Sequence, residues 1–109
     1  MLITIRNGKA ELRNDNGSLV RTMGSSNVVS VSMNSNQELV GIVYASGKAE
    51  IRRINGVLLR TLEPKDAVDI SFSGDQVAIR MSNGKTRVRK AANGVLCLLY
   101  TSDAADDLT

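Results

Sequence analysis

The sequence predicts an all-β repeat protein, and three observations support that prediction. Runs of five or six residues in which apolar and polar side chains alternate follow one another along the chain, and such alternation is typical of half-buried strands. Asn-Gly pairs separate many of these runs, and Asn-Gly supplies the positive φ angles that tight hairpin turns need. Three similar segments begin with Gly-Lys, at Gly8, Gly47 and Gly84, so the starts are 39 and 37 residues apart.

The strands are expected in a regular order. Residues 2–6 alternate up to Asn7-Gly8, and each later run likewise ends at a turn rich in Asn, Gly, Ser or Asp. Valine and methionine alternate with serine over 28–33, whereas 39–44 are almost entirely apolar. The expected strands are 2–6, 9–13, 18–23, 28–33, 39–44, 48–53, 57–62, 67–72, 76–81 and 85–89, with another beginning at Val95 and Leu96.

Four of these strands fit into one repeat, and a four-stranded unit of about 40 residues indicates a blade of a β-propeller. The inner strands are then 28–33 and 67–72, so the chain holds strands two to four of one blade and two further blades. A closed ring needs about four blades. We therefore predict an incomplete β-propeller of two to three four-stranded antiparallel blades over residues 1–96, followed by a tail.

Two structural expectations follow for the blades. Large apolar residues of the inner strands should be buried between sheets, namely Val29, Val31, Met33, Val68, Ile70 and Phe72. Both faces of these strands should be covered, which explains the small Ser30, Ser32 and Ser71 between them. The Asn-Gly pairs should form hairpin turns with glycine at positive φ; they are Asn7-Gly8, Asn16-Gly17, Asn55-Gly56, Asn83-Gly84 and Asn93-Gly94.

The last full repeat carries a motif of a known family. Ser-Phe-Ser-Gly-Asp at 71–75 ends an inner strand, an apolar strand follows, and Asn83-Gly84 leads into Lys-Thr-Arg-Val at 85–88. This unit resembles the blade of WD-repeat-like propellers, and the resemblance covers residues 1–96. The Trp-Asp pair that closes the third strand in that family is absent, as is the Gly-His pair before the inner strand. The resemblance therefore favours a divergent propeller of bacterial or phage type.

Composition limits the chemistry that this chain can perform. Of 109 residues, 42% are hydrophobic but only 3% are aromatic, so Val, Ile, Leu and Met must form the core. The single cysteine and the lack of histidine exclude a disulfide framework and a Ser-His-Asp triad. We therefore expect no catalytic residues, no metal and no cofactor. The first six residues are too short an apolar run for a secretion signal, which favours a cytoplasmic location.

The last residues do not follow the repeat. Leu-Arg-Thr-Leu at 59–62 follows Val57-Leu58 in the second copy, whereas Cys97-Leu98 follows Val95-Leu96. Residues 97–106 resemble the in-frame translation of a transposon-based sequencing adapter, which occurs at the ends of metagenomic reading frames. We therefore expect 97–109 to be a non-native tail, and deletion of 100–109 should leave folding unchanged.

Charged residues recur at alternate positions of the third strand in each repeat. The three sets are Lys9/Glu11/Arg13, Lys48/Glu50/Arg52 and Lys85/Arg87/Arg89. One interpretation is a basic stripe for phosphate or another polyanion. The favoured alternative is a solvated outer face with intrastrand ion pairs, each contributing about 0–1 kcal/mol. The aromatic residues on which nucleic-acid bases stack are nearly absent before the tail, which argues against nucleic acid as a partner.

Three aspartates could suggest a carboxylate site. Asp66, Asp69 and Asp75 lie on loops and at opposite ends of one expected strand, and the preceding repeat has Asn27, Ser30 and Asn36 there. Because Asx residues are favoured in turns for their side-chain hydrogen bonds, turn and edge roles explain these positions better.

These observations favour a binding module over an enzyme. Propellers present variable loops on two faces of a rigid ring, so the leading hypothesis is a non-enzymatic scaffold that presents loops to a protein partner. The sequence pattern singles out no particular binding residues, and self-association to complete a ring is a further expectation. Two alternatives are kept: a carbohydrate- or receptor-binding propeller of a phage structural protein, and a fragment of a propeller enzyme whose active residues lie in other blades.

Overall fold

The computed structural model describes residues 1–24, 27–91 and 96–101, and of residues 96–101 it describes only the backbone. The described residues form eleven strands and no helix, and therefore contain no helix able to cross a membrane. The strands are β1 (Leu2–Arg6), β2 (Lys9–Arg13), β3 (Leu19–Gly24), β4 (Val28–Met33), β5 (Leu39–Tyr44), β6 (Ala49–Arg53), β7 (Leu58–Glu63), β8 (Ala67–Ser73), β9 (Gln76–Met81), β10 (Lys85–Lys90) and β11 (Leu96–Thr101). Every complete strand expected from the sequence is confirmed, with bounds that differ by one residue at most.

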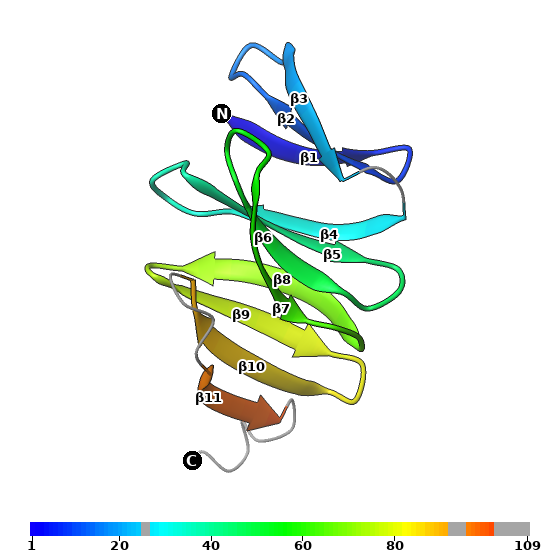
Figure 1. Ribbon diagram of the computed structural model, residues 1–109, viewed down its shortest axis with the longest axis vertical. Coiled ribbons are helices and arrows are strands. Elements are labelled where there is room, and N and C mark those ends of the chain that lie inside the picture. The colour runs from blue at the N-terminus through cyan, green and yellow to red at the C-terminus, as the bar shows by residue number, and fades with distance from the viewer. Residues whose placement is uncertain (25–26, 92–95, 102–109) are drawn as a thin grey trace.

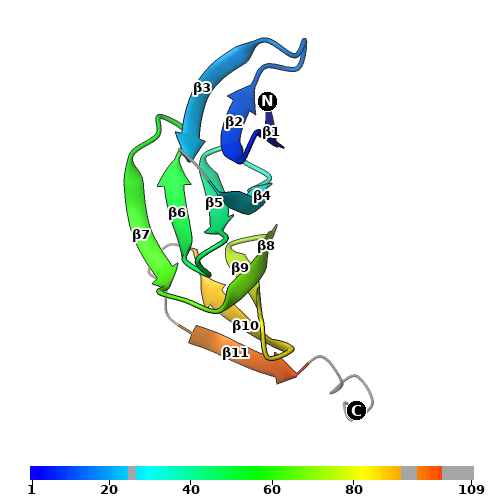
Figure 2. The same cartoon turned by 90° about the vertical axis from the view of Figure 1, so that its right-hand side faces the viewer.

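The strands form three antiparallel sheets in chain order (Figure 1). The first sheet contains β1 to β3, the second contains β4 to β7, and the third contains β8 to β11. Strand β4 packs on β1 on one side and on β8 on the other. The three sheets are stacked face to face and follow one another along an arc (Figure 2). The expected pattern of one three-stranded and two four-stranded units is confirmed.

The core lies in two layers between the sheets. The layer between the first two sheets buries Ala10, Leu12, Met23, Val28, Val40 and Ile42. The layer between the second and third sheets buries Val43, Ala49, Ile51, Leu62, Ala67, Ile70, Val77, Ile79, Met81 and Ala91. All of these side chains are aliphatic or methionine, as the composition requires. Each sheet therefore depends on its neighbour to bury its apolar face, as in other repeat architectures.

The burial of the inner strands differs from the expectation at two valines. Ile70 is buried and Phe72 is partly buried, as are Val31 and Met33, but Val29 is 50% exposed and Val68 is 41% exposed. The register of each inner strand shifts at this point, between Val28 and Ser30 in β4 and between Ala67 and Asp69 in β8. A bulge inserts one extra residue and reverses the alternation of faces. Val28 and Ala67 consequently take the buried positions.

The serines of the inner strands are covered on only one of the two strands. Ser30 is buried and Ser32 is partly buried because β8 lies against them, but Ser71 is exposed. No described sheet lies on the far face of the third sheet (Figure 1). The expectation that both faces are covered is therefore wrong for Ser71.

A backbone clip joins each sheet to the next, and the same geometry occurs twice. The residue before the inner strand has positive φ, at Asn27 (59°) and Asp66 (70°). Its carbonyl accepts a hydrogen bond from its own sheet, and the following N–H donates to a glycine carbonyl of the preceding sheet. The bonds are Ala45 N to Asn27 O (2.6 Å), Val28 N to Gly8 O (2.9 Å), Ser82 N to Asp66 O (2.7 Å) and Ala67 N to Gly47 O (2.9 Å).

The predicted Asn-Gly turns are confirmed wherever the structure describes them. The glycine φ angles are 75° at Gly8, 91° at Gly17, 93° at Gly56 and 89° at Gly84. Gly47, which lies in a Ser-Gly turn, also has positive φ, and a Cβ there would overlap the backbone nitrogen of Asp66. Only glycine therefore fits in that turn. The predicted turn at Asn93-Gly94 lies outside the described residues.

Strand β11 takes the fourth position of the third sheet. Its backbone register pairs Lys85 with Thr101 and Arg87 with Leu99. The backbone of residues 97–101 thus follows the repeat, contrary to the expectation from their sequence. Deletion of 100–109 would remove Tyr100 and Thr101 from β11. We therefore expect unchanged folding only when the deletion is limited to residues 102–109. The expected domain boundary at residue 96 stays a prediction.

Candidate interaction surfaces

The charged sets on the third strands are held in ion pairs of two kinds. In the first two sheets the pairs lie within one strand, as expected, because Arg13 Nη2 is 2.5 Å from Glu11 Oε1 and Arg52 Nε is 2.6 Å from Glu50 Oε2. The third sheet has Arg87 in place of the glutamate. Its arginines instead reach a glutamate at the end of β7, in the preceding sheet.

That glutamate is Glu63, and it bridges the second and third sheets. Its Oε1 accepts a hydrogen bond from Arg87 Nη1 and its Oε2 accepts one from Arg89 Nε, both at 2.8 Å. Glu63 is 1% exposed. Sequence analysis missed this role because the partners are 24 and 26 residues away. The available signal was the change from glutamate to arginine in the third copy.

Glu50 forms the corresponding buried cluster of the second sheet. It is fully buried, its Oε2 accepts hydrogen bonds from Tyr44 Oη (2.7 Å) and Arg52 Nε, and Lys48 Nζ lies 3.4 Å from its Oε1. Burial opposes ionisation of Glu50, but the hydrogen bonds from Arg52 and Tyr44 outweigh it and hold the pKa below its ordinary value. Burial, together with the Glu50 carboxylate, raises the pKa of Tyr44 to about 12.

The interpretation of a solvated charged face is therefore wrong for Glu50. Glu50 and Glu63 lie in the interior, where each charge is matched by arginine, whereas exposed ion pairs would leave both partners in water. These carboxylates are already occupied by arginine and tyrosine, so they serve packing between strands and sheets.

The three aspartates have separate structural roles, as expected. Asp69 Oδ1 accepts a hydrogen bond from Ser30 Oγ at 2.6 Å across the two sheets. Asp66 forms the backbone clip at one end of β8, and Asp75 lies in the turn at the other end, where its carbonyl accepts a bond from Ala91 N. The described residues contain no group of acidic, cysteine or histidine side chains that could hold a metal ion.

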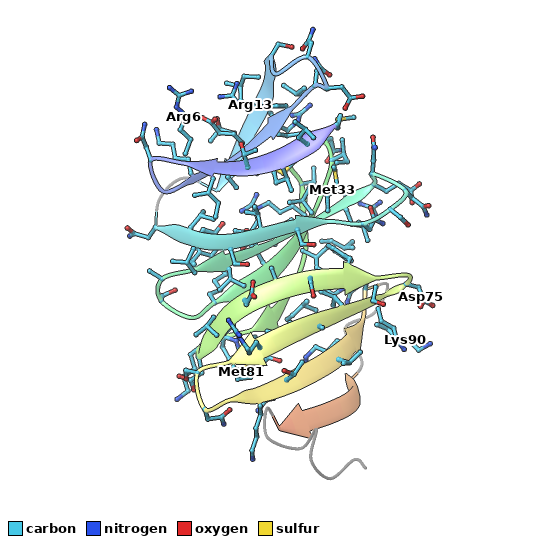
Figure 3. All side chains as sticks on the ribbon, turned by 180° about the vertical axis from the view of Figure 1, so that it is seen from behind. Arg6, Arg13, Met33, Asp75, Met81 and Lys90 are labelled. Carbon is cyan, nitrogen blue, oxygen red and sulfur yellow. The ribbon has the colours of Figure 1, made fainter. Side chains whose placement is uncertain are left out.

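The connections between strands gather at the two ends of the strands, on opposite sides of the stack of sheets. We call one the lysine end; it comprises residues 6–9, 24–28, 45–48, 63–67 and 82–85, of which 25–26 are not described. We call the other the groove end; its described parts are 13–19, 33–39, 53–58, 73–76 and 90–91. Figure 2 views the molecule from the lysine end. Figure 3 shows Arg6 at the lysine end, with Asp75 and Lys90 at the groove end.

Two adjoining hollows lie at the groove end. The larger, of about 590 Å³, is lined by Gln37, Glu38, Leu39, Arg53, Ile54, Asn55 and Leu59. The second, of about 400 Å³, is lined by Asn34, Ser35, Asn36, Glu38, Leu39, Gly74, Asp75 and Ala91. Because Glu38 and Leu39 line both, the two hollows lie side by side across the loops of the second and third sheets, and we call them together the groove.

The lysine end is predominantly basic. Arg6, Lys9, Lys65 and Lys85 are exposed, and Lys48 is partly exposed. Two acidic residues lie there, but Glu63 is buried with its arginines and only Asp66 is exposed. In contrast, the described groove end carries Arg13, Arg53 and Lys90 against Asp15, Glu38 and Asp75, together with the N-terminal ammonium of Met1, which lies 2.7 Å from Asp15 Oδ1.

Meandering four-stranded sheets stacked face to face, with the inner strands adjacent, define the blades of a β-propeller. Solved structures agree with this fold. The crystal structure of Sqt1 from Saccharomyces cerevisiae matches 87% of this chain with a TM-score of 0.73 and 17% identity. That of BamB from Moraxella catarrhalis matches 91% with a TM-score of 0.73 and 16% identity, and that of the C-terminal WD40 domain of Sif2 matches 85% with 0.68 and 19%.

The resemblance to WD-repeat-like propellers is thus confirmed at the level of the fold. The chain spans about three tenths of the length of these structures, since the match covers 29%, 31% and 28% of them. No protein-family model matches the sequence. No curated protein sequence matches it either.

Proposed function

We propose that this protein is a non-enzymatic binding module that presents the groove end to a protein partner. The groove itself supports the proposal best. Its larger hollow combines apolar Leu39, Ile54 and Leu59 with polar Gln37, Glu38, Arg53 and Asn55. Binding sites commonly combine an apolar lining with a few polar groups that fix orientation. The propeller fold, in which loops at the ends of the blades carry binding, is consistent with this assignment.

The loops that line the groove are ordered by hydrogen bonds within the protein. Asn34 Oδ1 accepts bonds from the N–H groups of Glu38 (2.9 Å) and Leu39 (3.0 Å), which fixes the β4–β5 loop. Ile54 N donates to Glu38 O at 3.1 Å, which ties that loop to the β6–β7 turn. A surface fixed before binding loses less conformational entropy when a partner docks. The groove is therefore built as a preformed site.

A peptide display library tests this function, with the full chain as target. We expect selected peptides to share a motif and to lose binding when Glu38→Arg reverses an exposed charge in the groove. The matched control is Thr61→Arg, on the exposed outer strand β7 away from the groove. No enriched motif, or equal loss in both variants, would contradict the proposal. Binding to a glycan array but not to peptides would instead favour the carbohydrate-binding alternative, and hydrolysis of a substrate panel would favour the enzyme alternative.

We also propose that the chain is a divergent cytoplasmic propeller of bacterial or phage origin. We propose further that additional blades complete the ring, either in a longer chain or from other copies. Exposed Val68 and Ser71 on the far side of β8 support the need for another blade, because open apolar faces and strand edges drive association. Light scattering is expected to show oligomers or aggregates at tens of micromolar. A cooperatively folded monomer would contradict this proposal.

The adapter origin of residues 97–106 stays a separate proposal, supported by their sequence. Amplification and sequencing of the source DNA across codon 96 tests it. The expected result is a native reading frame that departs from the present sequence after residue 96. A source gene that encodes Cys97 and the residues after it would show that this segment is native.

A further inference from the structure

We propose that the lysine end is a second interaction surface, which binds an acidic segment of a protein partner. The inference rests on the proposed function as a protein-binding module and specifies the chemistry of one partner. It starts from the charge difference between the two ends. The lysine end has five cations and one exposed acid, whereas the described groove end has four cations, the N-terminal ammonium included, and three acids.

The repeat itself produces this surface. In each sheet a glycine with positive φ closes the turn before the third strand, at Gly8, Gly47 and Gly84, and a lysine follows it. Each sheet therefore presents one lysine at the lysine end. Arg6, at the other end of the β1–β2 turn from Lys9, and Lys65, in the β7–β8 connection, add to the row. The sheets follow an arc in this view (Figure 2), so the cations are distributed along the arc.

The pairing of the glutamates explains why the lysines are left for a partner. Glu11 pairs with Arg13, and Glu63 pairs with Arg87 and Arg89, so the buried acids neutralise arginines within the fold. Within the described residues Lys9 and Lys85 form no ion pair, and neither do Arg6 and Lys65. Lys48 is the exception, because its ammonium lies 3.4 Å from Glu50.

The local charge is therefore not a by-product of a generally basic surface. The net charge of the whole chain is only +3, and cations exceed acids by only one at the described groove end. Like charges at one end repel one another until counter-ions or an anionic partner neutralise them. An anionic partner on this surface relieves that repulsion and gains attraction that salt can screen.

The chemistry of the lysine end favours carboxylates over nucleic acid. Sequence-tolerant binding of single strands uses aromatic side chains on which the bases stack. None of the described residues of the lysine end is aromatic. The adjoining Tyr44, at the last position of β5, already carries Lys48 5.7 Å from its ring centroid, and its hydroxyl donates a hydrogen bond to Glu50. The other lysines fit an extended acidic peptide, whose carboxylates need only point charges at intervals.

The test measures binding of a fluorescein-labelled peptide of ten glutamates to the full chain by fluorescence anisotropy. The double variant Lys65→Gln/Lys85→Gln removes two charges from the lysine end. The matched control, Arg21→Gln/Lys90→Gln, removes two exposed charges that lie outside the lysine end and outside the groove lining, and gives the same net charge. We expect the first variant to weaken binding about fivefold or more, the control to weaken it less than about twofold, and added salt to weaken all binding.

Circular dichroism and thermal melts check that both variants fold like the parent chain. No binding of the glutamate peptide, or equal weakening by the two variants, would overturn the inference. Tighter binding of a ten-nucleotide thymidine strand than of the peptide, lost in the lysine variant, would overturn it in favour of nucleic acid.

The groove-end experiment separates this result from the proposed function. Peptide binding that depends on Glu38 but not on the lysines leaves the binding module in place and removes only the second surface. Failure of both experiments removes the proposed function as well.

Discussion

The junctions on either side of the second sheet meet the same requirement in different ways. Each needs a buried carboxylate beside the arginines of a third strand. At the first junction Glu50 supplies it from the same strand as Arg52. At the second junction Glu63 supplies it from the preceding sheet. Charge neutralisation is local in the first case, whereas in the second it couples two sheets.

Two other positions change together with these glutamates. Gly24 and Glu63 are equivalent by register, since they pair with Ala10 and Ala49. A Cβ at Gly24 would lie 3.3 Å from Tyr44 Oη, so the tyrosine occupies the space beside it. The position equivalent to Tyr44 in the third sheet is Met81, which has no hydroxyl group. The junctions thus use alternative sets of residues, Gly–Tyr–Glu and Glu–Met–Arg.

The largest loss of stability is expected from Arg87→Glu. This substitution places a glutamate in the third sheet where the second sheet has Glu50. The new carboxylate would lie beside buried Glu63, and we expect the free energy of unfolding to fall by about 3–5 kcal/mol, because Glu63 loses one of its two arginine partners and gains a like charge in its place. Adding Glu63→Gly should recover part of that loss, since the new glutamate can then pair with Arg89. Urea denaturation of the single and double variants measures the coupling; simple additivity would show that the two sets are not interchangeable.

A smaller loss, about 2–3 kcal/mol, is expected for Glu63→Gln. Two charge-assisted hydrogen bonds are weakened, but Arg87 is partly exposed and can regain water. Arg80→Gln serves as control, because its partner Asp69 is exposed and 3.7 Å away. The urea midpoint should fall clearly for the first variant and hardly for the second. Equal midpoints would mean that the bridge between the sheets contributes no stability.

Tyr44→Phe should lower the free energy of unfolding by about 1–2 kcal/mol, because it removes one hydrogen bond to the charged, buried carboxylate of Glu50. It also tests the pH dependence. Folding raises the pKa of Tyr44 from 10.0 to about 12, so its stabilising contribution is complete below pH 10 and is lost as the pH rises towards 12. The parent chain should therefore lose stability over this range more steeply than Tyr44→Phe in thermal melts, and parallel curves would contradict the assigned hydrogen bond.

At acid pH the sign is reversed for Glu50. Its pKa is lowered in the fold, so its contribution is present above the ordinary value of 4.5 and is lost as the pH falls below that value. Glu50→Gln should be less stable than the parent at neutral pH, and the difference should shrink on acidification. A difference that stays constant to low pH would exclude ionised Glu50 as the source.

The smallest loss of stability is expected in the β6–β7 turn, where the carbonyl oxygen of Gly56 accepts a hydrogen bond from Arg52 Nη1 at 2.9 Å. Gly56 has a φ of 93°, so backbone strain in the Gly56→Val variant should lower the free energy of unfolding by more than about 1 kcal/mol. The nearest side chain, Arg21, would lie 3.7 Å from the new Cβ, so contact adds little. Val57→Ala, at the exposed position next to it, is the control. Unchanged thermal melts would mean that the turn relaxes to a different conformation.

The sequence predicted the features of this fold that depend on neighbours along the chain. Alternation and Asn-Gly turns located the strands because both act within a few residues. Val29 and Val68 were placed wrongly because a bulge reverses the faces, and no local pattern marks it. Glu63 was missed because its partners lie in the next sheet. The groove was not predicted either, since loops brought together by stacking are distant in sequence.

The backbone clips have a consequence for how such a chain can change in length. They use main-chain N–H and carbonyl groups, and a single Asx residue at positive φ, at Asn27 and Asp66. Few side chains therefore have to match for one unit to follow another, although clusters such as that of Glu63 still favour particular neighbours. Gene segments that encode a whole unit can then be duplicated or lost by recombination, while each surviving copy keeps its angle to the next.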